Sequence, residues 1–273
     1  MKTRCLTLLL ALVIAPAANA ASNPEDLPEV PTPAADAPAF QAHAETREVT
    51  WRALPGAFVH DQKEIWLHYP GGLATGHHWL PTLMIAGGTA ALIYADPHVA
   101  RYFRDQKHTQ HLDKVNDAFD PMITTGEIIA VPVSLMALGY ARHDNYQVDT
   151  ALECALAYGD SAIVDLALKA ITRRQRPSDV EAGGTFTDTF FSSSKSRLKG
   201  SGFPSGHSAG AFSVATVVAG RYKNHKWVPP VMYAMATAIS LSRISTNAHF
   251  TSDVFLGAAL GHTVAKYQVL RPQ

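Results

Sequence analysis

A single histidine, His207, lies where the glycine- and serine-rich stretch GSGFPSGHSAGAF (200–212) runs into small and apolar residues. Proline and serine before such a run are typical of a helix start, so Ser205 is expected to cap the first turn. A helix N-terminus presents unpaired N–H groups and a positive dipole end, and Gly206 lets the backbone approach a ligand closely. The stretch indicates an anion site beside His207, although loop-to-helix transitions of this composition also arise by chance.

A second stretch, KAITRRQRP (169–177), carries four basic side chains before a proline. Lys169 and Arg176 are two helical turns apart, so both face one side if the helix persists that far. Pro177 would then end the helix. Arg173 and Arg174 fit a simpler interpretation, a solvated basic helix end that is favourable to the helix dipole.

The third stretch, SRISTNAHFTSD (242–253), places His249 four residues before Asp253. On a helix these two side chains would be neighbours. A carboxylate beside one imidazole nitrogen fixes the tautomer and leaves the other nitrogen free as a nucleophile or base. The alternative is a helix-start pair with no chemical role.

Taken in order, the three stretches read K-x6-R-P, P-S-G-H and S-R-x5-H-x3-D. This pattern resembles the type 2 phosphatidic acid phosphatase superfamily, which includes bacterial non-specific acid phosphatases and vanadate-dependent haloperoxidases. The resemblance spans Lys169 to Asp253, about a third of the chain. The N-terminal half resembles the family only in being helical and in following an export signal.

The resemblance implies that Lys169, Arg176 and Arg243 hold the oxygens of a phosphate. This agrees with the chemistry, since a phosphoryl group carries spread negative charge and Arg pairs with it in bidentate fashion. Ser205 and the Gly206 N–H would add hydrogen-bond donors.

By the same resemblance, His249 is the nucleophile that forms a phosphohistidine, and Asp253 orients and charges it. His207 resembles the general acid that protonates the leaving oxygen, after which water hydrolyses the intermediate. Family members need no metal or other cofactor. His207, His249 and Asp253 could in principle be metal ligands, but three nearby cations would repel a metal ion and attract an oxyanion.

The functional expectation is an exported, metal-independent phosphatase acting on phosphate monoesters or lipid (pyro)phosphates. Two alternatives stay open: a vanadate-dependent haloperoxidase, and a non-catalytic envelope protein that binds phosphate or lipid. The acid phosphatases often show G-S-Y before P-S-G-H, whereas this chain has Ser201-Gly202-Phe203, a form that also resembles lipid phosphatases. The insert at 178–203 is expected to arch over the pocket, where Phe186, Phe190 and Phe191 could accept a lipid chain or a substrate base.

Apolar residues at helical spacing predict helices over 77–95, 126–143, 148–174, 208–222, 228–244 and 251–267. Few runs are β-branched and alternating, so the expected fold is all-α, a single helical bundle domain. The stretch 68–95 lacks Asp, Glu, Lys and Arg and is the strongest candidate for a membrane span, since spanning needs about 20 mostly apolar residues. A soluble or peripheral protein is nevertheless favoured, with membrane surface contact open.

The N-terminus MKTRCLTLLLALVIAPAANA (1–20) has a basic start, a short apolar run and a small-x-small end, which predicts a secretory signal peptide. Residues 21–48 are rich in Pro, Ala and acids and are interpreted as a disordered linker. The phosphatase domain is then 49–273, and the expected location is a bacterial periplasm. The formal net charge of +0 provides no basic surface for nucleic acid. The sequence leaves the oligomeric state open.

Overall fold

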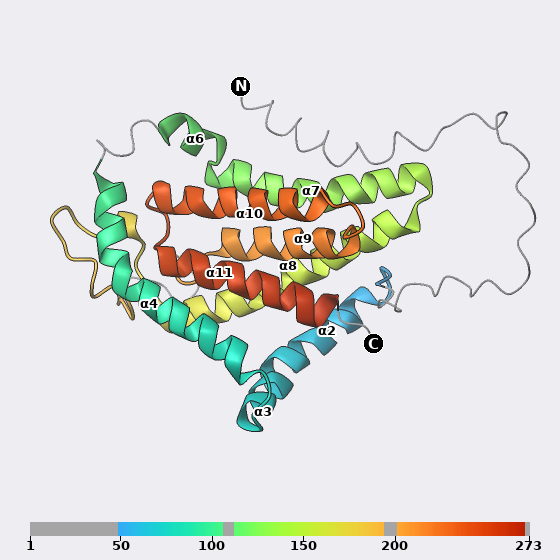
Figure 1. The fold of residues 1–273 in the computed structure, drawn as a ribbon, viewed down its shortest axis with the longest axis horizontal. Helices are drawn as coiled ribbons and strands as arrows, with labels where there is room; N and C mark the ends of the chain where they lie inside the picture. The colour runs from blue at the N-terminus through green and yellow to red at the C-terminus, as the bar shows by residue number, and fades with distance from the viewer. Residues whose placement is uncertain (1–48, 106–111, 194–200, 271–273) are drawn as a thin grey trace, which may run out of the picture.

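The structure is a computed structural model that describes residues 49–105, 112–193 and 201–270. These residues form helices and connecting turns with no strand among them, which confirms the all-α prediction (Figure 1). The longer helices are α2 (Leu54–Lys63), α4 (Trp79–Arg104), α7 (Pro121–Arg142), α8 (Asn145–Thr172), α9 (Gly206–Arg221), α10 (Val228–Ser245) and α11 (Thr251–Val264). The shorter ones are the π-helical turns η2 (Glu64–His68) and η5 (Ala265–Val269), the 3₁₀ turn η4 (Pro177–Asp179), α3 (Tyr69–Ala74) and α6 (Asp113–Ala118). The signal peptide and the linker expected over 1–48 lie outside the described residues.

Helix α9 is the centre of the bundle, packed against α7, α8, α10 and α11 (Figure 1). It is built mainly from small and β-branched residues, and eleven of its sixteen residues are buried. Helix α11 approaches α9 so closely that a Cβ atom on Gly257 would lie 2.4 Å from the Ser205 carbonyl oxygen. Only glycine fits there, and the close approach brings the start of α11 against the start of α9.

The helix ends follow local chemistry. Asp120 caps α7, accepting a hydrogen bond from the Met122 N–H, and Pro121 occupies the first helical position, so α7 begins five residues before the sequence pattern indicates. The prediction that a helix continues through Arg174 is wrong, because α8 ends at Thr172 with Arg173 in the left-handed region at φ 43°.

Four short or amphipathic segments before α7 were not predicted: α2, η2, α3 and α6. In Figure 1, α2 and α4 meet at α3 in a V that extends beyond the bundle. The stretch 68–95 is not one continuous helix, because a turn at 75–78 separates α3 from α4. Among the described residues α7 is instead the helix long and apolar enough to cross a membrane, and a third of that segment is buried in the bundle.

Candidate active site

A pocket of about 290 Å³ opens where α7, α8 and the start of α9 meet. Five of the predicted site residues line it, contributed by all three motifs: Lys169, Arg176, Gly206, His207 and His249. The remaining wall comes from α7 and α8, with Thr125, Ile128, Tyr158, Ala162, Asp165 and Leu166. The pocket therefore brings four basic or imidazole groups from distant parts of the chain to one place.

The first motif reaches the pocket from two different elements. Lys169 lies on the last turns of α8, and Arg176 follows the helix in extended backbone at φ −82°, ψ 158°. Both line the pocket although they do not share a helix face, so the expectation from helical spacing is wrong in its geometry. The chain turns at Arg173 and returns Arg176 to the side of Lys169.

Lys169 forms an ion pair with Asp165, one turn earlier on α8, with 2.6 Å between Nζ and Oδ2. Burial raises the pKa of Asp165 in spite of this cation. Sequence reasoning missed Asp165 as a pocket residue, although its spacing of four from Lys169 was a visible signal.

The second motif forms the start of α9 as predicted. Ser205 is the N-cap, and its hydroxyl accepts a hydrogen bond from the Ser208 hydroxyl at 3.1 Å and a long one from the Ser208 N–H at 3.5 Å. Ser205 is fully buried and does not line the pocket. Gly206 does, and a Cβ atom there would lie 3.1 Å from Lys169 Nζ. The glycine thus lets the lysine ammonium lie directly against the helix N-terminus, where unpaired N–H groups add to the positive field.

His207 projects from the first turn of α9 toward α7. Its Nε2 lies 3.2 Å from both the Pro121 carbonyl oxygen and Thr125 Oγ1. A carbonyl oxygen only accepts, so Nε2 carries a proton and Nδ1 is the unprotonated nitrogen of the neutral ring. Burial, followed by the positive charge of Arg243, lowers the pKa of His207 to about 4.

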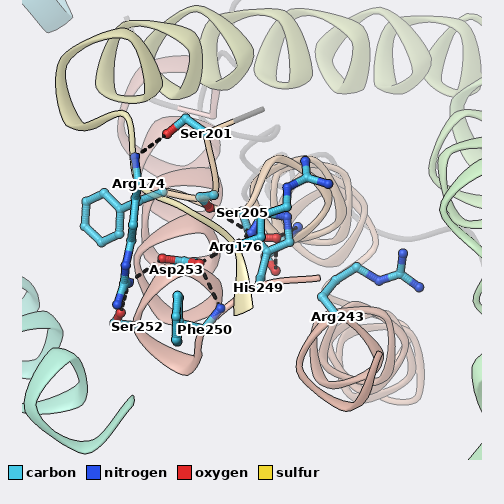
Figure 2. A network of polar contacts seen from close by, with 12 residues as sticks. Arg174, Arg176, Ser201, Ser205, Arg243, His249, Phe250, Ser252 and Asp253 are labelled. Atoms are coloured by element: carbon cyan, nitrogen blue, oxygen red, sulfur yellow. Dashed lines mark hydrogen bonds and ion pairs between the residues drawn. The ribbon is translucent and has the colours of Figure 1, made fainter. Parts of the chain in front are cut away.

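His249 lies just before α11, so it and Asp253 are not paired along a helix. Its Nδ1 donates to the Gly202 carbonyl oxygen at 2.7 Å, while Asp253 Oδ2 is farther away at 3.6 Å. Asp253 Oδ2 instead accepts from the Phe250 N–H at 2.8 Å, which caps the first turn of α11 (Figure 2). The nearer acceptor that fixes the ring is a backbone carbonyl, which the sequence could not reveal.

Arg243, near the end of α10, is fully buried and does not line the pocket. Its Nε and Nη2 donate to Ser242 Oγ, and Nη1 has no hydrogen-bond partner among the described residues. Burial lowers its pKa, with Asp120 and Glu127 acting in the opposite direction. Figure 2 shows its guanidinium turned away from His249. The positive charge of Arg243 also contributes to the lowered pKa of His207, which lines the pocket.

Two sequence expectations differ from the structure. None of the described residues of the 178–203 insert lines the pocket. Phe186 packs edge-to-face on Phe250 and Phe190 lies against Phe203, so these two rings are part of the interior; Phe191 is 65% exposed. Residues 194–200 lie outside the described part.

The second concerns Arg174, which was interpreted as part of a solvated helix end. It is 1% exposed and is paired with two carboxylates, Asp96 and Asp253. The end of α8 at Thr172 turns its side chain inward, which the helical spacing of the sequence could not show.

Comparison with known proteins confirms the family resemblance over the C-terminal part of the chain. Residues 150–271 match the model of the PAP2 superfamily, which is the type 2 phosphatidic acid phosphatase superfamily. A lipid A 1-phosphatase of Porphyromonas gingivalis is 40% identical over 65 residues, which cover 23% of this chain and 15% of that protein. A solved transmembrane PAP2-type phosphatidylglycerolphosphate phosphatase from Bacillus subtilis aligns over 80% of this chain and 92% of its own, at 17% identity and a TM-score of 0.41.

Proposed function

With the match of residues 150–271 to the PAP2 superfamily as the premise, we propose that this protein is an exported, metal-independent phosphatase that hydrolyses a lipid phosphate. The observation that carries the proposal is the pocket, in which Lys169 and Arg176 lie with Gly206, His207 and His249. The catalytic domain is assigned to residues 49–273, after a signal peptide and a linker.

The pocket supports phosphoryl transfer to His249. Because Nδ1 donates to the Gly202 carbonyl, the other ring nitrogen, Nε2, holds the free electron pair. Nε2 attacks phosphorus, the P–O bond to the alcohol breaks, and His207 gives a proton to the leaving oxygen. Water then attacks the phosphohistidine, His207 takes a proton from it, and the P–N bond breaks to release phosphate.

The cations stabilise the charge of this reaction. Lys169 and Arg176 lie where they can donate to the non-bridging oxygens, and the start of α9 adds its N–H groups. Arg243 completes the set when its side chain rotates toward the bound phosphate, which gives the unpartnered Nη1 an acceptor.

The protonation of His207 is coupled to substrate. In the empty pocket its pKa of about 4 keeps the ring neutral, and the causes include the positive charges of Arg243 and Lys169. A bound phosphate brings negative charge beside the ring and offsets those cations, which raises the proton affinity of His207. Binding of the substrate phosphate therefore favours the protonated form of His207, which is the form that can act as the general acid.

The surface around the pocket favours a lipid phosphate over a soluble one. Leu166 lines the pocket and is 45% exposed, and Ile163 lies one turn away on α8. On α7, which contributes Thr125 and Ile128 to the pocket, exposed apolar side chains lie at helical spacing beside Thr125: Met122, Ile129 and Val133. An acyl chain leaving the pocket would meet this surface, and the lipid A 1-phosphatase relative agrees with such a substrate.

The activity is tested by phosphate release from the purified protein, produced from the full chain. A soluble monoester is compared with phosphatidic acid in mixed micelles, each with chelator and with vanadate. The expected result is faster release from the lipid, unaffected by chelator, blocked by vanadate and absent in His249→Ala. Loss of release with chelator would contradict the histidine mechanism, and preference for the soluble ester would contradict the lipid assignment.

Membrane contact is tested separately by flotation with phospholipid vesicles. Met122→Glu places a charge on the exposed apolar face of α7, and Trp227→Glu is the matched control because Trp227 precedes α10, at the opposite end from Arg243. We expect only Met122→Glu to reduce flotation. An equal effect of both variants, or of neither, would contradict the assignment of this face.

A further inference from the structure

Arg174 is buried at the junction of all three motifs. It follows the left-handed residue that ends α8, and it is 1% exposed. Its guanidinium lies over the rings of Phe250 and Phe190, with 4.1 and 4.4 Å from Cζ to the ring centroids. An arginine without solvent must have its charge and its donors satisfied by the protein, and here one of its partners, Asp253, lies 3.6 Å from the candidate nucleophile.

The side chain of Arg174 binds the Asp253 carboxylate through the oxygen that does not face His249. Nη1 donates to Asp253 Oδ1 at 2.6 Å and to Ser252 Oγ at 2.7 Å. Nη2 donates to Asp96 Oδ2 at 2.7 Å, and Nε donates to Thr189 Oγ1 at 3.1 Å. The fork thus fixes one oxygen of Asp253 while the other oxygen caps α11 and faces His249 Nδ1 at 3.6 Å.

The backbone of Arg174 holds the other acceptor of His249. The Arg174 N–H donates to Ser201 Oγ at 3.0 Å, and the Arg174 carbonyl accepts from the Gly202 N–H at 2.7 Å. The Gly202 carbonyl in turn accepts from His249 Nδ1 at 2.7 Å. One residue therefore fixes both groups that face this ring nitrogen, one through its side chain and one through its main chain (Figure 2).

We propose that Arg174 is a positioning residue for His249, which holds Asp253 and the Gly202 carbonyl so that the ring keeps its proton on Nδ1 and offers Nε2 to the pocket. The catalytic role of the free Nε2 rests on the proposed function. The position of the His249 ring follows from the contacts alone. Arg174 touches neither the pocket nor a substrate, because it does not line the pocket. Its effect reaches the reaction only through His249.

The role differs from that of a structural salt bridge elsewhere in the bundle. Arg221 is also buried, and its Nη1 lies 3.3 Å from Glu153 Oε1 at the far end of α9 from His207. Among the contacts of Arg221, those with Thr150, Glu153 and Tyr146 involve residues that do not line the pocket. Both arginines have largely buried side chains that pair with a carboxylate, but Arg174 pairs with two, and one of these, Asp253, faces His249.

The test compares Arg174→Gln, Arg174→Lys and the control Arg221→Lys. Lysine keeps the charge but has one ammonium, which cannot replace a fork that reaches Asp253, Asp96 and Thr189 together. For each folded variant we would measure kcat and KM, the affinity for vanadate, and the ¹⁵N NMR shifts of the His249 ring, which report the tautomer.

We expect Arg174→Lys to lower kcat by about 10- to 100-fold, the size of effect that follows when the partner orienting a metal-bound histidine is removed. KM and vanadate affinity should change little because Lys169 and Arg176 remain, and the ¹⁵N shifts should show a mixture of tautomers. Arg221→Lys should change none of these. If Arg174→Gln does not fold, Arg174→Lys decides.

A folded Arg174→Lys with unchanged kcat and unchanged ¹⁵N shifts would overturn the inference. The inference would also be overturned if Arg174→Lys and Arg221→Lys lost kcat and vanadate affinity to the same extent. That result would show a general structural role for both arginines. If the wild-type protein releases no phosphate, the proposed function fails, and a tautomer change in Arg174→Lys would still support the positioning role.

Discussion

Replacing Arg243 with methionine should separate stability from catalysis. The substitution removes two hydrogen bonds to Ser242 Oγ, each contributing about 0.5–1.5 kcal/mol, and it also removes the unpartnered Nη1, whose burial costs about 1–3 kcal/mol. These contributions are of similar size and opposite sign. The free energy of unfolding of Arg243→Met should therefore stay within about 1 kcal/mol of the wild-type value.

Catalysis should respond quite differently to the same change. One charge-assisted hydrogen bond from Arg243 to the phosphate contributes about 1.5–3 kcal/mol, so its loss should lower kcat/KM by about 10- to 150-fold. The matched contrast is Arg174→Met, which leaves Asp96 and Asp253 buried without their cation and should cost about 3–5 kcal/mol of stability.

Urea unfolding and phosphate release from the same preparations measure both quantities. The reasoning is refuted if Arg243→Met loses as much stability as Arg174→Met, because Arg243 would then be a structural ion-pair member. It is equally refuted if Arg243→Met keeps its full kcat/KM, because the guanidinium would then not reach the phosphate.

Three further predictions concern stability, each measured by urea unfolding. Gly257→Ala should cost about 1–3 kcal/mol, since its Cβ would meet the Ser205 carbonyl oxygen at 2.4 Å, whereas Gly56→Ala on α2, with open space around it, should not destabilise; equal effects would contradict the packing. The pKa of His207 is about 4 in the folded protein and 6.5 ordinarily, so the free energy of unfolding of the wild type should decrease as pH falls from 6.5 to 4. His207→Gln should remove this contribution to the decrease. Burial raises the pKa of Glu153 from 4.5 to about 7, so the wild type loses stability as pH rises through this range. Glu153→Gln should therefore be stabilised relative to the wild type above pH 7. A gain in stability only at low pH would contradict the predicted direction of this pH dependence.

The sequence was sufficient for the helical fold and for most of the pocket. Apolar spacing located α7, α8, α9, α10 and α11, since each of these long helices buries a face in the bundle, and the apolar composition of 77–95 located α4 although only three of its residues are buried. The short elements α2, η2 and α3 were missed because they bury little. Glu64–His68 and Tyr69–Ala74 have no buried residue, so no apolar period marks them.

The residues that line the pocket were predictable where side-chain type carries the chemistry. Lys169, Arg176, His207 and His249 are identified by charge and by imidazole, and the structure brings them together. What the sequence could not show are contacts that depend on the path of the chain. The Gly202 carbonyl faces His249 only because the turn after α8 pairs Gly202 with the backbone beside it.

Arg174 and Arg243 illustrate the limit most clearly. Both lie within or next to a motif. The sequence pattern predicted that Arg174 is exposed to solvent and that Arg243 binds the phosphate. In the structure both are buried, and only the contacts distinguish them: Arg174 has two carboxylates within hydrogen-bond distance, while Arg243 has none within 4.0 Å among the described residues. Charge alone does not determine which arginine stabilises the fold and which one is available to bind an anion.

The central claim, that His249 takes the phosphoryl group, is tested most directly by trapping the intermediate. Phosphorus-labelled phosphatidic acid would be mixed with the protein and quenched in alkali, which preserves an N–P bond, and the labelled peptide would be identified by mass spectrometry. The account predicts label on the peptide that contains His249, and none in His249→Ala. Label on another residue, or full turnover in His249→Ala, would contradict it.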